Sequence, residues 1–215
     1  MKRRAVFVPA AFLVLVLTAA GPAAAARPAP SLEKKIKEIT EALTPGLIDL
    51  RRDIHAHPEL GLREFRTSAL VADYFRKLGL EVRTGFATTG VIGILKGGKP
   101  GPVAALRGDM DALPLTEETD LPFASREKAV VDGRETGLMH ACGHDIHTTI
   151  LLGVAAVLSA VKADLPGTVV FVAQPAEETV GGAALMIRDG AFRDLVPEAF
   201  YAYHVDDTLK AGRIG

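Results

Sequence analysis

The sequence lacks tryptophan and has one cysteine among its 215 residues. A single cysteine cannot form a disulfide within the chain, so the protein is not a small disulfide-stabilised domain. The chain also lacks an excess of charge, because 25 basic and 26 acidic residues leave a formal net charge of −1. This balance excludes the basic face that nucleic-acid-binding proteins use, and we expect no nucleic-acid partner.

The N-terminus has the order of features that exported proteins share. Residues 2–4 are basic, residues 5–20 are mostly apolar, and small residues continue to Ala26. This order predicts a signal peptide over residues 1–26 and an exported protein, either periplasmic or secreted. The alternative is an uncleaved membrane anchor, but the apolar run falls short of the ~20 residues that a spanning helix needs. We expect no stable membrane span after signal cleavage.

The spacing of apolar residues in the remaining chain predicts alternating helices and strands. Residues 27–44 are predicted to form a linker and an N-terminal helix. A second helix is predicted from Pro45 to Ala56, because Thr44-Pro45 resembles a helix start and Pro58 a stop. Further helices are predicted at 68–78, 146–161 and 182–188, and strands at 91–95, 103–107, 168–173 and 200–205. This alternation predicts an α/β fold, a three-layer α/β/α domain with a largely parallel sheet.

The segment from His140 to His147 concentrates metal-binding side chains. Its eight residues contain three of the six histidines, the only cysteine and Asp145. Thiolate, neutral imidazole and carboxylate are the ligands of Zn²⁺ and related divalent ions. Gly143 lets the backbone bend between Cys142 and His144. The alternative interpretation is a buried cysteine beside surface histidines.

Three other polar clusters follow predicted strands. They are Asp109 with Asp111, Glu177 with Glu178, and His204. In open α/β sheets, binding sites form at the carboxyl ends of strands. We therefore expect these clusters to converge with the segment around Cys142.

Four ordered motifs, at residues 52–60, 107–114, 139–148 and 174–178, resemble the M20 metallopeptidase family. The Cys-Gly-His-Asp sequence at 142–145 is similar to its amidohydrolase branch, which contains hippurate hydrolases, N-acyl-amino-acid deacetylases and plant auxin-conjugate hydrolases. The resemblance covers residues 45–215. It implies a zinc-exopeptidase-like catalytic domain with two divalent metal ions, of Zn, Mn, Co or Ni. It assigns the ligand positions to Cys142, His144, Glu178 and His204, and the general base to Glu177.

Other residues match the family less directly. Asp109 and Asp111 lie where other members have a His-x-Asp ligand motif, with Asp109 at the histidine position. We therefore expect both to orient ligands. His147 follows Gly143 by one helical turn and is predicted to orient the site or face the substrate. His140, His55 and His57 are predicted to be structural.

The resemblance implies hydrolysis of the amide bond of N-acyl amino acids or small peptides by metal-activated water with a glutamate base. The expected partner is this small-molecule substrate, and the full-length form is expected to be a homodimer. The family inserts a lid and dimerisation domain after the region near Gly215 and then returns to the catalytic domain. Residues 45–215 are therefore expected to be the N-terminal part of an incomplete catalytic domain.

Two other interpretations remain open at this point. Cys142 could be a nucleophile with His144 or His140 as its base. The chain could also be a truncated, non-catalytic remnant that binds metal or a partner.

Overall fold

The computed structural model describes residues 30–210 and 212–214. The predicted signal peptide lies outside the described residues. The elements, in chain order, are α1 (Pro30–Ala56), α2 (Phe65–Lys77), β1 (Glu81–Phe86), β2 (Gly90–Lys96), β3 (Lys99–Asp109), β4 (Lys128–Val131), β5 (Arg134–Gly137), α3 (His144–Ala160), a 3₁₀ turn (Lys162–Asp164), β6 (Pro166–Gln174), α4 (Gly182–Arg188) and β7 (Ala199–Ala202). Among the described helices, none is long and apolar enough to span a membrane.

The central sheet has the strand order β1-β2-β6-β3-β7. β3 is parallel to both β6 and β7, whereas β2 is antiparallel to β1 and β6, so four of the five strands point the same way. The prediction of a largely parallel sheet is confirmed. The register of β3 and β6 pairs Asp109 with Gln174. The polar segments that follow these two strands therefore leave the sheet at the same edge.

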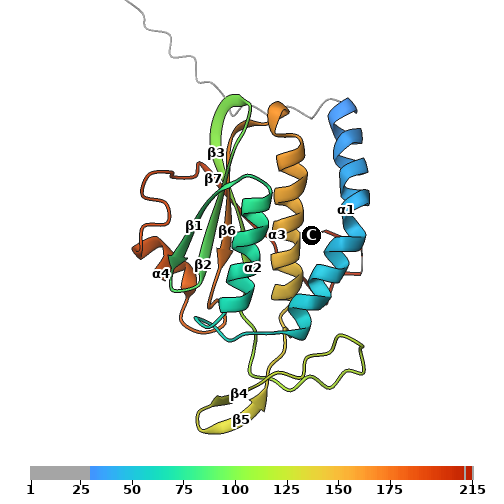
Figure 1. Cartoon of the computed structure of the whole chain (residues 1–215), viewed down its shortest axis with the longest axis vertical. Coiled ribbons are helices and arrows are strands. Elements are labelled where there is room, and N and C mark those ends of the chain that lie inside the picture. The colour runs from blue at the N-terminus through green and yellow to red at the C-terminus, as the bar shows by residue number, and fades with distance from the viewer. Residues whose placement is uncertain (1–29, 211, 215) are drawn as a thin grey trace, which may run out of the picture.

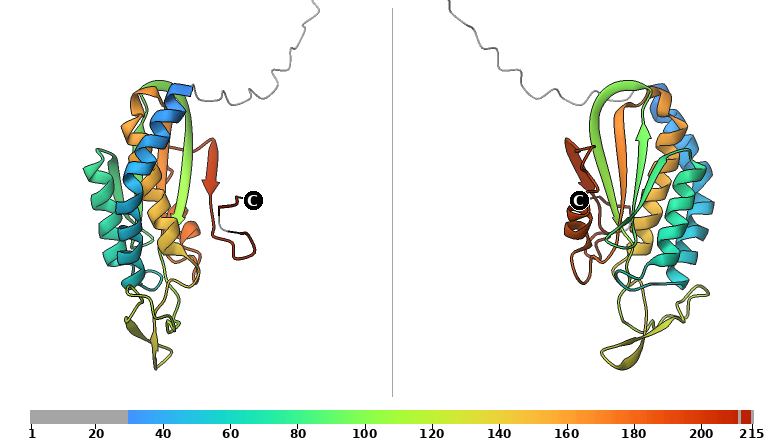
Figure 2. Two further views of the ribbon diagram at one scale, coloured as in Figure 1. Left: turned by 90° about the vertical axis from the view of Figure 1, so that its right-hand side faces the viewer. Right: turned by 60° about the vertical axis from the view of Figure 1, so that its left-hand side comes forward.

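Helices cover both faces of the sheet, which confirms the three-layer prediction. α1, α2 and α3 lie on one face, and α4 lies on the other (Figure 2). On the first face Phe75 of α2 packs against Phe171 of β6, with ring centroids 5.7 Å apart. On the second face Met186 of α4 packs with Ile92 and Val172. Burial of these side chains is the main term that holds the layers together.

The prediction of a helix break at Thr44-Pro45 is wrong, because α1 continues through Pro45 as one helix. Figure 1 shows that this helix bends about half-way along its length. Proline removes one backbone donor and usually kinks a helix rather than ending it when packing supports both halves. That support comes from α3, since Leu47 lies so close to Gly153 that a Cβ there would be 2.9 Å from Leu47 Cδ1.

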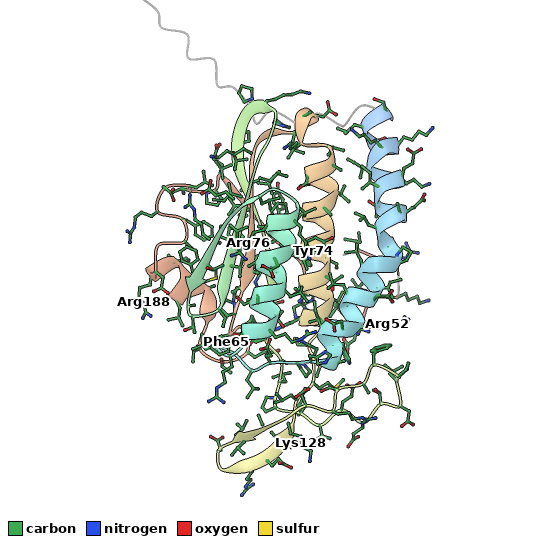
Figure 3. The ribbon with its side chains drawn as sticks, in the orientation of Figure 1. Arg52, Phe65, Tyr74, Arg76, Lys128 and Arg188 are labelled. Carbon is green, nitrogen blue, oxygen red and sulfur yellow. The ribbon has the colours of Figure 1, made fainter. Side chains whose placement is uncertain are left out.

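The sequence patterns missed β1 and the β4–β5 hairpin. β1 is an edge strand in which no residue is fully buried and polar residues interrupt the apolar ones, so it lacks the apolar run of a buried strand. The hairpin projects away from the sheet, and Lys128 at the start of β4 marks it in Figure 3. The last strand is shorter than predicted and ends at Ala202, because residues 203–205 turn toward α3.

Replacing Gly46 with alanine is expected to stabilise the protein by about 1 kcal/mol, because glycine is a poor helix former. Gly46 lies in α1, and a Cβ added there meets no atom within 4 Å. The measurement is the urea midpoint of unfolding. Gly153→Ala in α3 is the matched control, and we expect no gain from it because its Cβ meets Leu47. A lower midpoint for Gly46→Ala would contradict the local structure of α1.

Candidate metal centre

The four polar clusters predicted from the sequence meet at one edge of the sheet. This edge is formed by the ends of β3 and β6, the first residues of α3 and the segment after β7, at the lower end of the sheet in Figure 1. The clusters come from positions as distant as Asp109 and His204 in the chain. Convergence at the carboxyl ends of strands agrees with the general rule for open α/β sheets.

Gly143 shapes the turn between Cys142 and His144. Its φ is +85°, a left-handed conformation that glycine adopts without strain. A Cβ at this position would also lie 2.5 Å from Cγ2 of Val205. The absent side chain lets the segment after β7 approach, and Cys142 Sγ lies 3.3 Å from Nε2 of His204.

His144 is completely buried among three carboxylates. Its Nδ1 lies 3.3 Å from Asp111, and its Nε2 lies 3.6 Å from Asp109 and 3.7 Å from Glu178. Neither ring nitrogen has a hydrogen-bond partner, nor does Glu178 Oε1, whereas Asp109 Oδ2 pairs with the guanidinium of Arg107. Buried polar atoms normally have partners, and these atoms are donors of the kind that divalent cations take. The residues present therefore fit a metal ion.

The adjacent residues Glu177 and Glu178 have different environments. Both backbone N–H groups donate to the carboxylate of Asp111, each at 3.0 Å. The side chain of Glu178 is 19% exposed and turns toward His144, whereas Glu177 is exposed. Glu178 can therefore hold a cation inside the site, and Glu177 can contact a solvent molecule or substrate.

His147 is buried with both ring nitrogens occupied. Nδ1 lies 2.7 Å from Asp109 Oδ1, and Nε2 accepts the N–H of Val205 at 2.9 Å. The hydroxyl of Tyr203 also donates to the carbonyl of His147 at 2.8 Å. Of the two roles predicted for His147, this geometry favours orienting neighbouring residues over contacting substrate.

Among the residues that the structure describes, three sets of side chains could each hold a cation, because their donor atoms lie within 4.8 Å of one another. They are Cys142–His144–His204, His144–Glu177–Glu178 and Asp109–His144–His147. The first two contain the five residues predicted as ligands and base, and His144 is shared by all three. The third is the weakest set, since His147 already uses both nitrogens. The structure thus brings the predicted residues together, and their roles stay predictions.

The negative charge of the site affects its titrating groups. Burial, with Glu178 and Glu177 adding to it, raises the pKa of the Cys142 thiol to about 12. Burial opposes a charged imidazole at His144, but the carboxylates of Asp111, Asp109 and Glu178 outweigh it and raise the pKa of His144. Without a cation, the site therefore holds protons that metal ligation would displace.

The histidines predicted to be structural lie beside the site. His55 Nδ1 is 2.8 Å from Asp145, and the carboxylate of Asp145 also pairs with Arg51 at 2.7 Å. His140 is buried, and burial lowers its pKa to about 4. His57 donates to the carbonyl of Asp53 within α1. The Asp145 pairs link the start of α3 to α1, which agrees with a structural role.

The model of peptidase family M20/M25/M40 matches residues 105–215, about half of the chain. The chain belongs to this family. The matched M20 region contains all the residues predicted as ligands, general base or orienting groups.

Curated M20 relatives extend the match. The N-acetylcysteine deacetylase of Bacillus subtilis is 42% identical over 170 residues, which cover 79% of this chain and 42% of that protein. Thermostable carboxypeptidase 1 of Saccharolobus solfataricus is 41% identical, over 84% of this chain and 44% of its own length. The crystal structure of a dinuclear metal binding peptidase of the M20 family from Bacillus subtilis superposes with a TM-score of 0.69 and 40% identity, covering 77% of this chain and 44% of that one. The chain spans less than half the length of each of these three relatives.

Zinc binding at neutral pH is expected to release about one more proton from the wild type than from Cys142→Ala, because ligation requires the thiolate. The pKa of Cys142, about 12, lies above neutral pH, so the free thiol is protonated. Zinc affinity is therefore expected to rise with pH between about 6 and 8. Calorimetry in two buffers of different ionisation enthalpy counts the protons. An equal count for both proteins would show that Cys142 does not bind zinc.

Proposed function

We propose that this protein is a metal-dependent hydrolase that cleaves the amide bond of N-acyl amino acids or small peptides. The observation that carries this proposal is the exposed carboxylate of Glu177, within 4.8 Å of ligand atoms on His144 and Glu178. A base beside unpartnered metal-ligand atoms is the arrangement that hydrolysis needs.

Cys142, His144, Glu178 and His204 would hold two divalent ions, of Zn, Mn, Co or Ni. When bound, such ions lower the pKa of a water molecule and polarise a carbonyl oxygen. The chain supplies the geometry for this set. The backbone N–H of Glu178 donates to Asp111, which fixes Glu178. The backbone N–H of Val205, the residue after His204, donates to His147 and is fixed in the same way.

The carboxylate of Glu177 performs the proton transfers. It takes a proton from water as the oxygen forms a bond to the carbonyl carbon of the substrate. It then passes the proton to the nitrogen as the carbon–nitrogen bond breaks, which leaves an amine and a carboxylic acid, and at neutral pH the acid gives its proton to the amine. The exposure of Glu177 supports this role, since a base must reach both the water molecule and the leaving nitrogen.

The substrate class is supported by the names of the relatives. A deacetylase of N-acetylcysteine and a carboxypeptidase both cleave an amide bond, and this shared chemistry is what we carry over to the chain. We also propose a homodimer for the whole protein, as expected from the family resemblance. The size exclusion volume of the whole gene product tests that assembly.

A second candidate function is nucleophilic catalysis by Cys142. The 3.3 Å approach of His204 Nε2 to Sγ supports it, with His204 instead of His144 or His140 as the proposed base. Reactive cysteines, however, have a lowered pKa, whereas burial and the nearby glutamates raise that of Cys142. If the chain is instead a non-catalytic remnant, we expect it to bind metal without turning over substrate.

Glu177→Gln is expected to lower kcat for an N-acyl amino acid by roughly 10²- to 10⁴-fold, because it removes the general base. The measurement uses the whole gene product loaded with zinc, with metal content checked to be unchanged. Glu135→Gln is the control, since Glu135 pairs with Lys128 on the exposed hairpin away from the site.

Unchanged turnover by Glu177→Gln would overturn the proposed mechanism. Alkylation of Cys142 that abolishes activity equally with and without added metal would favour the nucleophile. Absence of turnover by a zinc-loaded wild type would favour the non-catalytic remnant.

We propose that the protein is exported, on the basis of the N-terminal pattern of charge and apolarity. The expected result is a mature protein that begins at Arg27, found outside the cytoplasm of the producing cell. N-terminal sequencing of the purified protein measures this. A protein that keeps Met1 in the cytoplasmic fraction would contradict export.

A further inference from the structure

Glu64 is a completely buried carboxylate that the proposed mechanism does not use. It immediately precedes Phe65, which is labelled at the lower end of α2 in Figure 3. Glu64 occupies the N-cap position of α2, yet its side chain makes no capping hydrogen bond. Glu59 performs that task instead, accepting the N–H groups of Arg66 and Thr67 at 2.8 Å each. The buried carboxylate therefore has a use other than starting its own helix.

The two oxygens of Glu64 bind groups from two distant segments. Oε1 accepts the backbone N–H of Ala176 at 2.8 Å, and Oε2 accepts the hydroxyl of Thr89 at 2.6 Å. Thr89 lies in the turn between β1 and β2 and is itself buried. Glu64 thus connects the start of α2 and the β1–β2 turn to the residue that precedes Glu177.

Ala176 has a backbone conformation that needs external support. Its φ is +50°, in the left-handed region that residues with a Cβ rarely adopt. It also packs so closely against Gly61 that a Cβ there would lie 3.0 Å from Ala176 Cα. Residues held in such conformations cluster at functional sites, where surrounding contacts keep them in place.

Two buried acids together bind three successive amides of this turn. Glu64 accepts the N–H of Ala176, and Asp111 accepts the N–H groups of Glu177 and Glu178. Asp111 also lies against His144, so it belongs to the metal centre itself. Glu64 does not touch the ligand side chains and acts only through the backbone.

We propose that Glu64 is a positioning residue that holds Ala176 in its left-handed conformation and thereby directs Glu178 toward the metal and Glu177 toward the substrate. The inference rests on the proposed function for its catalytic meaning. The claim that Glu64 fixes the turn at residues 176–178 can be measured in the metal-free protein. This claim and the proposed function can therefore be disproved independently.

The first measurement is backbone amide exchange in the metal-free protein. Glu64→Ala is expected to accelerate exchange at residues 176–178 by about tenfold or more, with protection in β6 unchanged, because one local contact is lost. Glu64→Gln is expected to stay close to wild type, since its amide can accept from Ala176 and donate to Thr89. Should Glu64→Ala fail to fold, Thr89→Val removes the hydroxyl donor and keeps the side-chain shape, and a smaller acceleration is expected.

The second measurement is zinc affinity by calorimetry. Glu64→Ala is expected to weaken zinc binding about 10- to 100-fold, as loss of groups that orient ligands generally does. Glu59→Gln is the matched control, because Glu59 also accepts two backbone N–H groups but at the start of α2. It is expected to leave both zinc affinity and exchange at 176–178 unchanged.

The outcomes separate the two proposals. Unchanged exchange at 176–178 in Glu64→Ala overturns the positioning role, whatever the protein does with zinc. Accelerated exchange with unchanged zinc affinity overturns the link between Glu64 and the metal centre. A wild type that binds none of zinc, manganese, cobalt and nickel overturns the metal-dependent function, while faster exchange in Glu64→Ala would still show that Glu64 fixes the turn.

Discussion

The candidate centre depends on the carboxylate of Asp111. It binds the backbone of Glu177 and Glu178, which follow β6, and lies 3.3 Å from the ring of His144, which begins α3. Asp111 itself follows β3, so one side chain ties three segments together at the edge of the sheet. The parallel register of β3 and β6 makes this contact possible, because it brings Asp109 and Gln174 level with each other. Without that register, the two acidic segments would leave the sheet at different heights.

The site concentrates acidic groups in a buried place. Asp109 and Asp111 are buried, and the guanidinium of Arg107 lies 2.5 Å from Asp109. Buried charges are costly unless they are paired, so this arrangement is favourable only with compensating positive charge. A protonated His144 supplies part of that charge in the metal-free protein, since the surrounding carboxylates outweigh burial and raise its pKa. A divalent ion would supply more, and its binding would then be coupled to folding.

Much of the architecture was predictable, because buried strands and amphipathic helices have strong apolar patterns. β2, β3, β6 and α3 are of this kind, and their polar ends indicated the site. The bend at Pro45 was not predictable, because the packing of α1 on α3 outweighs the local preference of proline. β1 and the hairpin were missed because few of their residues are buried, so they lack the apolar run of a core strand. Glu64 gave no signal in the sequence, because it lies outside the helix predicted at 68–78 and only the fold places it beside Ala176.

Because β7 is a short strand, one side of the candidate centre is held less firmly than the other. His204 follows an outer strand of four residues that pairs with β3 on one side only, and the contacts of Tyr203 and Val205 with His147 hold this segment in place. Short outer strands open locally at lower free energy than central ones. Of the predicted ligands, His204 is therefore expected to leave the site most easily, while His144 is completely buried. If His144 and His204 hold the same cation, they would fix the segment after β7 against the start of α3 whenever metal is bound.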